Sequence, residues 1–211
     1  SSRRRHTRWC VRSRGLGDVY KRQVNDYSLV IDYKATTDSD TVVNLTNHAY
    51  FNLDNQQQSI DSHDIRIEAD QFTPVDGDKI PSGEIREIEG TRFDLRRRTA
   101  LRTTSSEDGQ SREYDHNFVL KNGDGMLHRV ATLSSPQSGL SMHLHTTQAG
   151  LQLYTGEYLT DPFRPRAGLC LEAQGFPDAP NQPAFPSARL APGDVYQQRI
   201  IYEFVPGKPY S

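Results

Sequence analysis

Apolar and polar residues alternate along most of the chain after residue 24, and this period of two predicts β-strands. No segment keeps the helical period over ten residues. The loop SSPQSG at residues 134–139 predicts a hairpin between two of the runs. The alternating apolar positions fall into short runs: Leu29, Ile31 and Tyr33; Ile65 and Ile67; Leu140, Met142 and Leu144; Leu151 and Leu153; Leu169 and Leu171. The pattern therefore predicts an all-β fold.

The first 23 residues differ in composition from the rest. They hold seven Arg and one Lys against a single Asp, whereas the remainder holds 17 basic and 26 acidic side chains. They lack both the alternation and the apolar stretch of a secretory signal. The string also resembles a translated sequencing adapter. We therefore expect residues 1–23 to be an artefactual or disordered basic segment, and residues 24–211 to be the C-terminal part of one domain.

Charge and hydropathy argue against several classes of partner. Because the chain after residue 23 is acidic, we expect neither nucleic acid nor an anionic membrane surface to bind it. No run approaches the roughly 18 apolar residues of a membrane-spanning helix. Cys170 is the one cysteine after residue 23, which excludes an intramolecular disulfide there and fits a reducing compartment. We expect a cytoplasmic protein, a monomer or weak dimer, that binds a small molecule.

The densest polar segment is NLTNHAYFNL at residues 44–53. It combines three Asn, one His and two aromatic residues, and a structural strand rarely carries so many polar groups. Sugar sites need this mixture, because amides bind hydroxyls, aromatic faces contact the C–H surface of the ring and an imidazole can transfer protons. The alternative is a turn at a strand end, with His48 on the surface.

Two further segments place carboxylates next to apolar strands. Glu172 follows the apolar run 168–171, where partial desolvation would raise its pKa and make it a better base near neutrality. The alternative is a strand-end Glu172 that faces solvent. Asp115 and His116 precede a short apolar strand, which suits a binding role, although Asp115 could equally close a turn.

Together these segments resemble the aldose 1-epimerase family, also called the galactose mutarotase family. Residues 44–53 match its NLTNHxYFNL signature, residues 114–120 its YDHxFxL segment and residues 168–186 its GLxLExQxFPDxPNxPxFP stretch, in the family's order. Residues 154–159 are similar to its YTGNFL segment, with Glu157 in place of Asn. The resemblance implies a β-supersandwich whose N-terminal part is missing here. The family's substrate-binding Arg and a further His belong to that part and have no counterpart after residue 23.

The resemblance also implies a function, the interconversion of the α and β anomers of free aldoses such as galactose and glucose, with no cofactor and no metal. It assigns Glu172 as catalytic base and His48, as an imidazolium, as catalytic acid. Asp115 would bind sugar hydroxyls, with Asn47 and Gln174 as further binding residues. Two proton carriers suffice to open and reclose the ring. Because the sugar-orienting Arg and His are missing, we expect this chain to be poorly active.

Several alternatives stay open. A glycoside hydrolase would use Asp115 and Glu172 as paired carboxylates and would need no His. A non-catalytic sugar-binding β-sandwich would tolerate loss of Glu172. A mutarotase of hexose 6-phosphates would need a basic pocket, and the basic residues of this chain are too scattered to predict one. His143 and His145 could bind zinc from one face of a strand, although a solvated sheet face also explains them.

Overall fold

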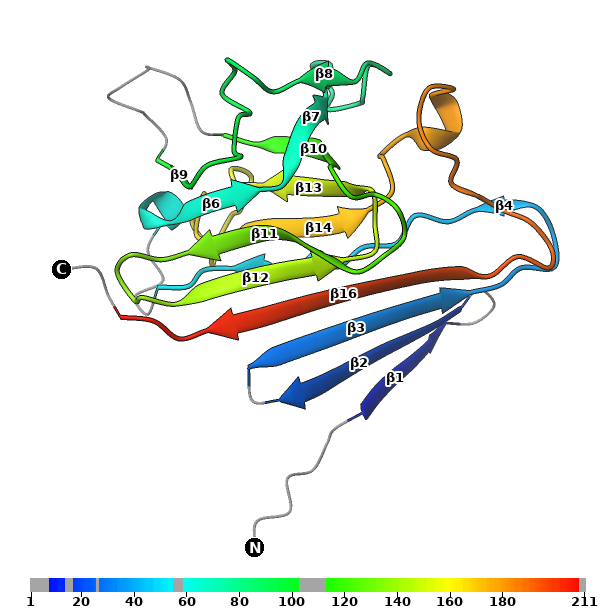
Figure 1. The fold of residues 1–211 in the computed structure, drawn as a ribbon, viewed down its shortest axis with the longest axis horizontal. Coiled ribbons are helices and arrows are strands. Elements are labelled where there is room, and N and C mark those ends of the chain that lie inside the picture. Colours follow the sequence, from blue (N-terminus) through cyan, green and yellow to red (C-terminus); the bar gives the residue numbers. More distant parts are fainter. Residues whose placement is uncertain (1–7, 14–16, 26, 55–58, 103–112, 209–211) are drawn as a thin grey trace, which may run out of the picture.

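The computed structural model describes residues 8–13, 17–25, 27–54, 59–102 and 113–208, and its regular structure is almost entirely β (Figure 1). Two short 3-10 helices, η1 (Ile60–Ser62) and η2 (Ala179–Asn181), are the helical elements of these residues. Over the same residues, no helix has the length and apolar character needed to cross a membrane. The all-β prediction is confirmed.

The strands form three antiparallel sheets, of eight, six and two strands. In spatial order the eight-stranded sheet contains β1 (Arg8–Ser13), β2 (Gly17–Asn25), β3 (Ser28–Ala35), β16 (Tyr196–Val205), β12 (Ser141–Thr146), β11 (His128–Ser134), β6 (Asp64–Ile67) and β9 (Thr99–Ala100). The six-stranded sheet contains β5 (Tyr50–Phe51), β14 (Leu169–Gln174), β13 (Gly150–Tyr154), β10 (Asp115–Leu120), β7 (Ala69–Thr73) and β8 (Arg86–Glu87). The small sheet pairs β15 (Arg189–Leu190) with β4 (Thr41–Val42).

The two large sheets share one apolar core. Alternate residues of each strand point into it, which is the arrangement that the sequence pattern predicts. The eight-stranded sheet contributes Ile31, Tyr33, Ile65, Ile67, Leu133, Met142, Leu144, Ile200 and Tyr202, and the six-stranded sheet contributes Phe72, Phe118, Leu151, Leu153, Leu169, Leu171 and Ala173. Burial of this apolar surface is the main favourable contribution to the stability of the fold.

β1 and most of β2 lie in the basic segment at the start of the chain, which we expected to be artefactual or disordered. β2 pairs with β3 over its whole length, from Gly17 opposite Ala35 to Asn25 opposite Ser28. The side chain of Val19 is partly buried and packs against the core. Because β3 would otherwise present an unpaired edge, the preceding residues can pair with it despite their charge. The artefactual origin of residues 1–23 stays a prediction.

Side chains from the eight-stranded sheet hold β14 in place. β5 is only two residues long and reaches β14 at Leu169 and Cys170. Further along β14, the Tyr202 hydroxyl donates to the Leu171 carbonyl at 3.3 Å, and the Gln198 amide donates to the Ala173 carbonyl at 2.8 Å. These bonds satisfy carbonyl groups that β5 does not reach, and they fix the strand that carries Glu172.

Candidate active site

β14 is buried on both of its faces, and this is unusual for a strand with polar residues. Leu169, Leu171 and Ala173 face the core. Because side chains alternate along a strand, Cys170, Glu172 and Gln174 share the opposite face. This second face, turned away from the core, carries the candidate site.

The neighbouring strands complete this face. In the antiparallel register, Gln152 of β13 lies opposite Glu172, Tyr154 of β13 lies opposite Cys170, and Asp115 of β10 lies opposite Tyr154. The Gln152 amide donates to Asp115 Oδ1 at 2.8 Å. Residues far apart in sequence therefore meet because the sheet places them in adjacent rows.

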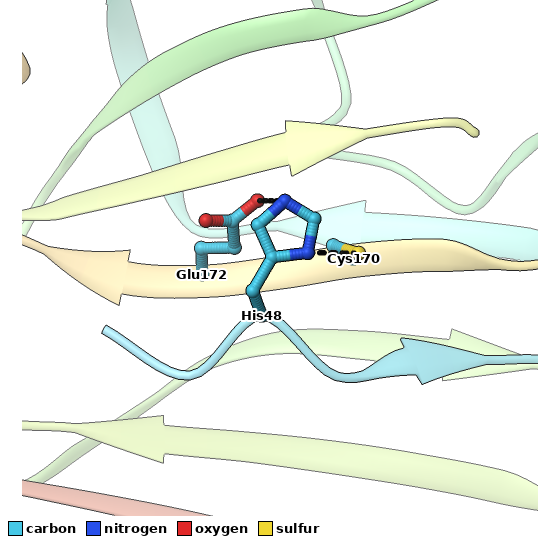
Figure 2. Close-up of side chains that lie close together, drawn as sticks. All are labelled: His48, Cys170 and Glu172. Carbon is cyan, nitrogen blue, oxygen red and sulfur yellow. Dashed lines mark hydrogen bonds and ion pairs between the residues drawn. The ribbon is translucent and has the colours of Figure 1, made fainter. Parts of the chain in front are cut away.

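His48 reaches the same face from the loop between β4 and β5. Its Nε2 lies 3.3 Å from Glu172 Oε1, and its Nδ1 lies 3.3 Å from Cys170 Sγ (Figure 2). The His48 side chain is 52% exposed, whereas that of Glu172 is 10% exposed. The histidine thus contacts the carboxylate at its buried end and keeps one side open to an incoming ligand.

Polar residues of this loop, together with Asn52 just after β5, hold the segment against β14 and the residues that flank it. Asn44 Oδ1 accepts from the Gly175 N–H at 2.8 Å, and its amide nitrogen donates to the Gly175 carbonyl. The Thr46 hydroxyl donates to the Ala173 carbonyl at 3.0 Å, and the Asn52 amide donates to the Ala167 carbonyl at 2.9 Å. We expected these amides to bind sugar hydroxyls. Asn44 and Asn52 instead bind backbone and position His48.

Asn47 lies inside the same loop. Its Oδ1 accepts from the Ala49 N–H at 3.2 Å and lies 3.5 Å from the Tyr202 hydroxyl. It is absent from the residues that line the cavity described below. The geometry therefore gives Asn47 a role in shaping the loop, and its contact with substrate stays a prediction.

A cavity of about 280 Å³ opens over this face of the sheet. Its volume falls just below the usual range for small-molecule sites and suits a single sugar ring. Its lining brings together four of the predicted residues with three that were not predicted: His48, Asp115, Glu172 and Gln174, and Gln152, Tyr154 and Pro177. Gln152 could have been noticed as a polar residue between Leu151 and Leu153 in a buried strand.

Burial raises the pKa of Glu172, the nearby His48 acts in the opposite direction, and the negative charge of Asp115 raises it further. Desolvation is the largest of these effects because the carboxylate lies at the bottom of the cavity. The direction agrees with the sequence prediction. A carboxylate with a raised pKa is a stronger base near neutral pH than an ordinary glutamate.

His116 does not belong to this site, although the sequence suggested it as a candidate. Asp115 faces the cavity, so the next residue along β10 points to the core. The His116 ring packs against Phe93, with ring centroids 4.7 Å apart, and against Phe72. Burial is the main cause that lowers the pKa of His116 to about 4, and nearby Arg92 and Lys79 lower it further.

Glu157, which replaces the family's Asn, lies beside the site in a structural cluster. It accepts from Arg166 Nη1 at 2.8 Å, and the same guanidinium pairs with Asp61 at 2.7 Å. Arg166 is buried, and its pairing with two carboxylates compensates its desolvation. The substitution therefore holds the loop after β13 in place.

Two groups of residues offer donor atoms for a metal. His48, Cys170 and Glu172 offer nitrogen, sulfur and oxygen atoms within 4.8 Å of one another. However, Cys170 and Glu172 contact opposite nitrogens of the His48 ring, so neither nitrogen is in contact with both. This arrangement fits proton transfer through the ring better than metal chelation, in which one nitrogen would face both partners.

The second group consists of His143 and His145, which lie on the eight-stranded sheet. The His143 Nδ1 is 3.0 Å from the Thr132 hydroxyl, and the His145 Nε2 is 3.2 Å from Glu203 Oε2. Each histidine therefore has its own partner on a neighbouring strand. These contacts agree with a solvated sheet face.

Comparisons with known proteins agree on the family. The family model described as aldose 1-epimerase matches residues 19–203. The chain is 40% identical to the galactose mutarotase of Homo sapiens over 185 residues, which cover 83% of this chain and 54% of that protein. It is 36% identical to the aldose 1-epimerase of Escherichia coli strain K12 over 201 residues, or 89% of this chain and 58% of that protein. The chain thus spans about half the length of the curated relatives it matches.

Solved structures resemble the fold. The GalM/aldose epimerase homologue from C. elegans superposes with a TM-score of 0.80 at 29% identity, covering 95% of this chain and 69% of that one. The galactose 1-epimerase from Lactobacillus acidophilus gives a TM-score of 0.74 at 24% identity, covering 91% and 57%, and supports the fold alone. These structures therefore share the fold of this chain.

Proposed function

The chain belongs to the aldose 1-epimerase family, and from this premise we propose that it interconverts the α and β anomers of a free aldose such as galactose or glucose. The observation that carries the proposal is the contact between His48 Nε2 and Glu172 Oε1, 3.3 Å apart in a cavity of sugar size. One side chain can accept a proton while the other donates one, which is what anomer exchange requires.

In the proposed reaction, the Glu172 carboxylate takes the proton of the anomeric hydroxyl. The bond between C1 and the ring oxygen breaks, and the His48 imidazolium protonates that oxygen through Nε2. The open-chain aldehyde rotates about the C1–C2 bond and then presents its other face. Reclosure returns both protons, so that His48 and Glu172 recover their starting states and no cofactor is consumed.

Asp115, Gln152 and Gln174 are proposed to hold the sugar hydroxyls. Asp115 Oδ1 is already bonded to Gln152, which leaves its other oxygen available to accept from a hydroxyl. Gln152 and Gln174 line the cavity, and amide groups can bind sugar hydroxyls. These groups would orient the ring so that its C1 meets Glu172.

The proposal is tested by polarimetry on freshly dissolved α-D-galactose and α-D-glucose. The rate with the purified chain is compared with the buffer-catalysed rate. The expected result is an acceleration of the approach to anomeric equilibrium, which should be weak because the sugar-orienting Arg and His implied by the resemblance have no counterpart after residue 23. Release of an aryl leaving group from an aryl glycoside would instead support the glycoside hydrolase with Asp115 and Glu172 as paired carboxylates. Sugar binding by calorimetry without either reaction would support a binding module.

We further infer that the protein binds an aldose and neither nucleic acid nor a membrane, and that it acts as a monomer or weak dimer in the cytoplasm. Support comes from the acidic charge balance after residue 23, since neither nucleic acid nor an anionic membrane would attract such a surface. Size-exclusion chromatography with light scattering would measure the oligomeric state.

A further inference from the structure

Cys170 is a buried side chain of the site that the proposed reaction does not use. It lies two residues before Glu172 on the same face of β14 and is fully buried. Its Sγ lies 3.3 Å from His48 Nδ1. Figure 2 shows the thiol at one nitrogen of the ring and Glu172 at the other.

Two tyrosine rings lie beside this contact. Tyr50 and Tyr154 lie opposite Cys170 on the two neighbouring strands. Both rings also contact His48, with centroid separations of 5.2 and 6.2 Å. Because Cys170 is fully buried, water does not solvate its sulfur, and even the weak hydrogen-bonding capacity of a thiol can orient the imidazole.

The thiol can be a partner to His48 in both of its protonation states. Burial is the main cause that raises the pKa of Cys170, and the nearby Glu172 charge adds to it, so the sulfur keeps its proton. In both states that the reaction uses, the imidazolium and the neutral ring left after Nε2 has given up its proton, Nδ1 carries a hydrogen, and the sulfur can accept weakly from it. The hydrogen bond made by one ring nitrogen sets which nitrogen exchanges its proton.

We propose that Cys170 is a positioning residue that occupies His48 Nδ1 and so directs proton transfer to the sugar through Nε2. This inference rests on the proposed function, because it assigns a role within the same reaction. Cys170 does not touch the substrate in this scheme, and it acts only through His48. A thiol, unlike a carboxylate partner, adds no negative charge that would hold the proton on the ring.

The first test is a nitrogen-15 NMR measurement on the whole chain with labelled histidine. The His48 signals, among those of seven histidines, are assigned by their loss in His48→Gln. In the wild type with a neutral ring, the Nδ1 resonance should show the shift of a protonated nitrogen that donates a hydrogen bond. In Cys170→Ala it should move to the free imidazole position, and in Cys170→Ser it should move only part of the way.

The second test is kinetic and uses the same variants. Cys170→Ala should lower kcat about fivefold, the loss expected for one hydrogen bond, with little change in KM. Cys170→Ser keeps an acceptor and should recover part of the rate. Thermal unfolding of both variants is the control, because a merely structural cysteine would change the melting temperature without moving the Nδ1 resonance.

An Nδ1 resonance that is the same in the wild type and in Cys170→Ala would overturn the proposal, as would equal kcat values in these two proteins. The NMR measurement needs no substrate. A chain without mutarotase activity whose Nδ1 resonance still depends on Cys170 would therefore refute the proposed function while supporting the contact between thiol and imidazole.

Discussion

The most informative single substitution is Glu172→Gln, which removes the proposed base and keeps its shape. Asp115, the other carboxylate of the cavity, lies two strands away on β10, so it does not occupy the position from which Glu172 takes the proton. A positioned base contributes about 10²–10⁴-fold to a rate, and without a substitute we expect kcat to fall about 10³-fold. KM should change little, because the amide retains the volume of the carboxylate.

The same substitution should leave the fold intact or stabilise it. The pKa of Glu172 is raised in the folded state, so its ionised form is destabilising above that pKa and harmless below the pKa of the unfolded chain. A neutral Gln removes this penalty at neutral pH. Glu203→Gln is the matched control, because Glu203 pairs with His145 on the other sheet, outside the cavity.

The assay combines polarimetry on fresh α-D-galactose with thermal unfolding for the wild type and both variants. We expect activity to be lost in Glu172→Gln alone, at an unchanged or higher melting temperature. A Glu172→Gln rate within about twofold of the wild type would refute the assignment of the base. Activity lost together with a large drop in melting temperature would show that the carboxylate supports the fold instead.

Four further predictions follow from the same geometry. His48→Gln should lower kcat about 10²–10⁴-fold, and in polarimetry the double variant with Glu172→Gln should be little slower than the slower single variant. Asp115→Asn should raise KM more than it lowers kcat, and a loss confined to kcat would make Asp115 a reacting group. In a pH profile, kcat/KM should fall as Glu172 is protonated, and because its pKa is raised, the acidic limb should lie above the usual value of 4.5. Gly156→Ala should destabilise the fold by more than about 2 kcal/mol in chemical denaturation, because this residue has φ of 77° and a Cβ there would clash with a carbonyl oxygen. The control Gly77→Ala places its Cβ where no atom lies within 4 Å, and it should be nearly neutral.

The sequence predicted the strands and four lining residues of the cavity, because alternation and the long motifs are local signals. It did not predict Gln152 or the role of Cys170, since both depend on which strands are neighbours and in which register. A single sequence does not specify that register. For the adjacent pair Asp115 and His116, the sequence was sufficient. Alternation along a strand implies that these two side chains point to different faces, so at most one of them could face the cavity.

The β1 and β2 strands show where composition misled the prediction. A high local charge favours disorder in isolation, but β2 pairs along the full length of β3. Backbone pairing with an existing edge does not depend on the sign of the side chains. Elements of this kind become visible only when the partner strand is known.

The two buried faces of β14 have a consequence for engineering. Residues that support folding and residues that surround the ligand alternate along this strand, so random substitution would mix two unrelated effects at neighbouring codons. A library restricted to the cavity face, for example at Gln174, could be screened for altered sugar preference without altering the Leu171 and Ala173 packing. Sugar specificity could then be evolved in a few rounds, because changes on the cavity face would not lower the thermal stability that the core face provides.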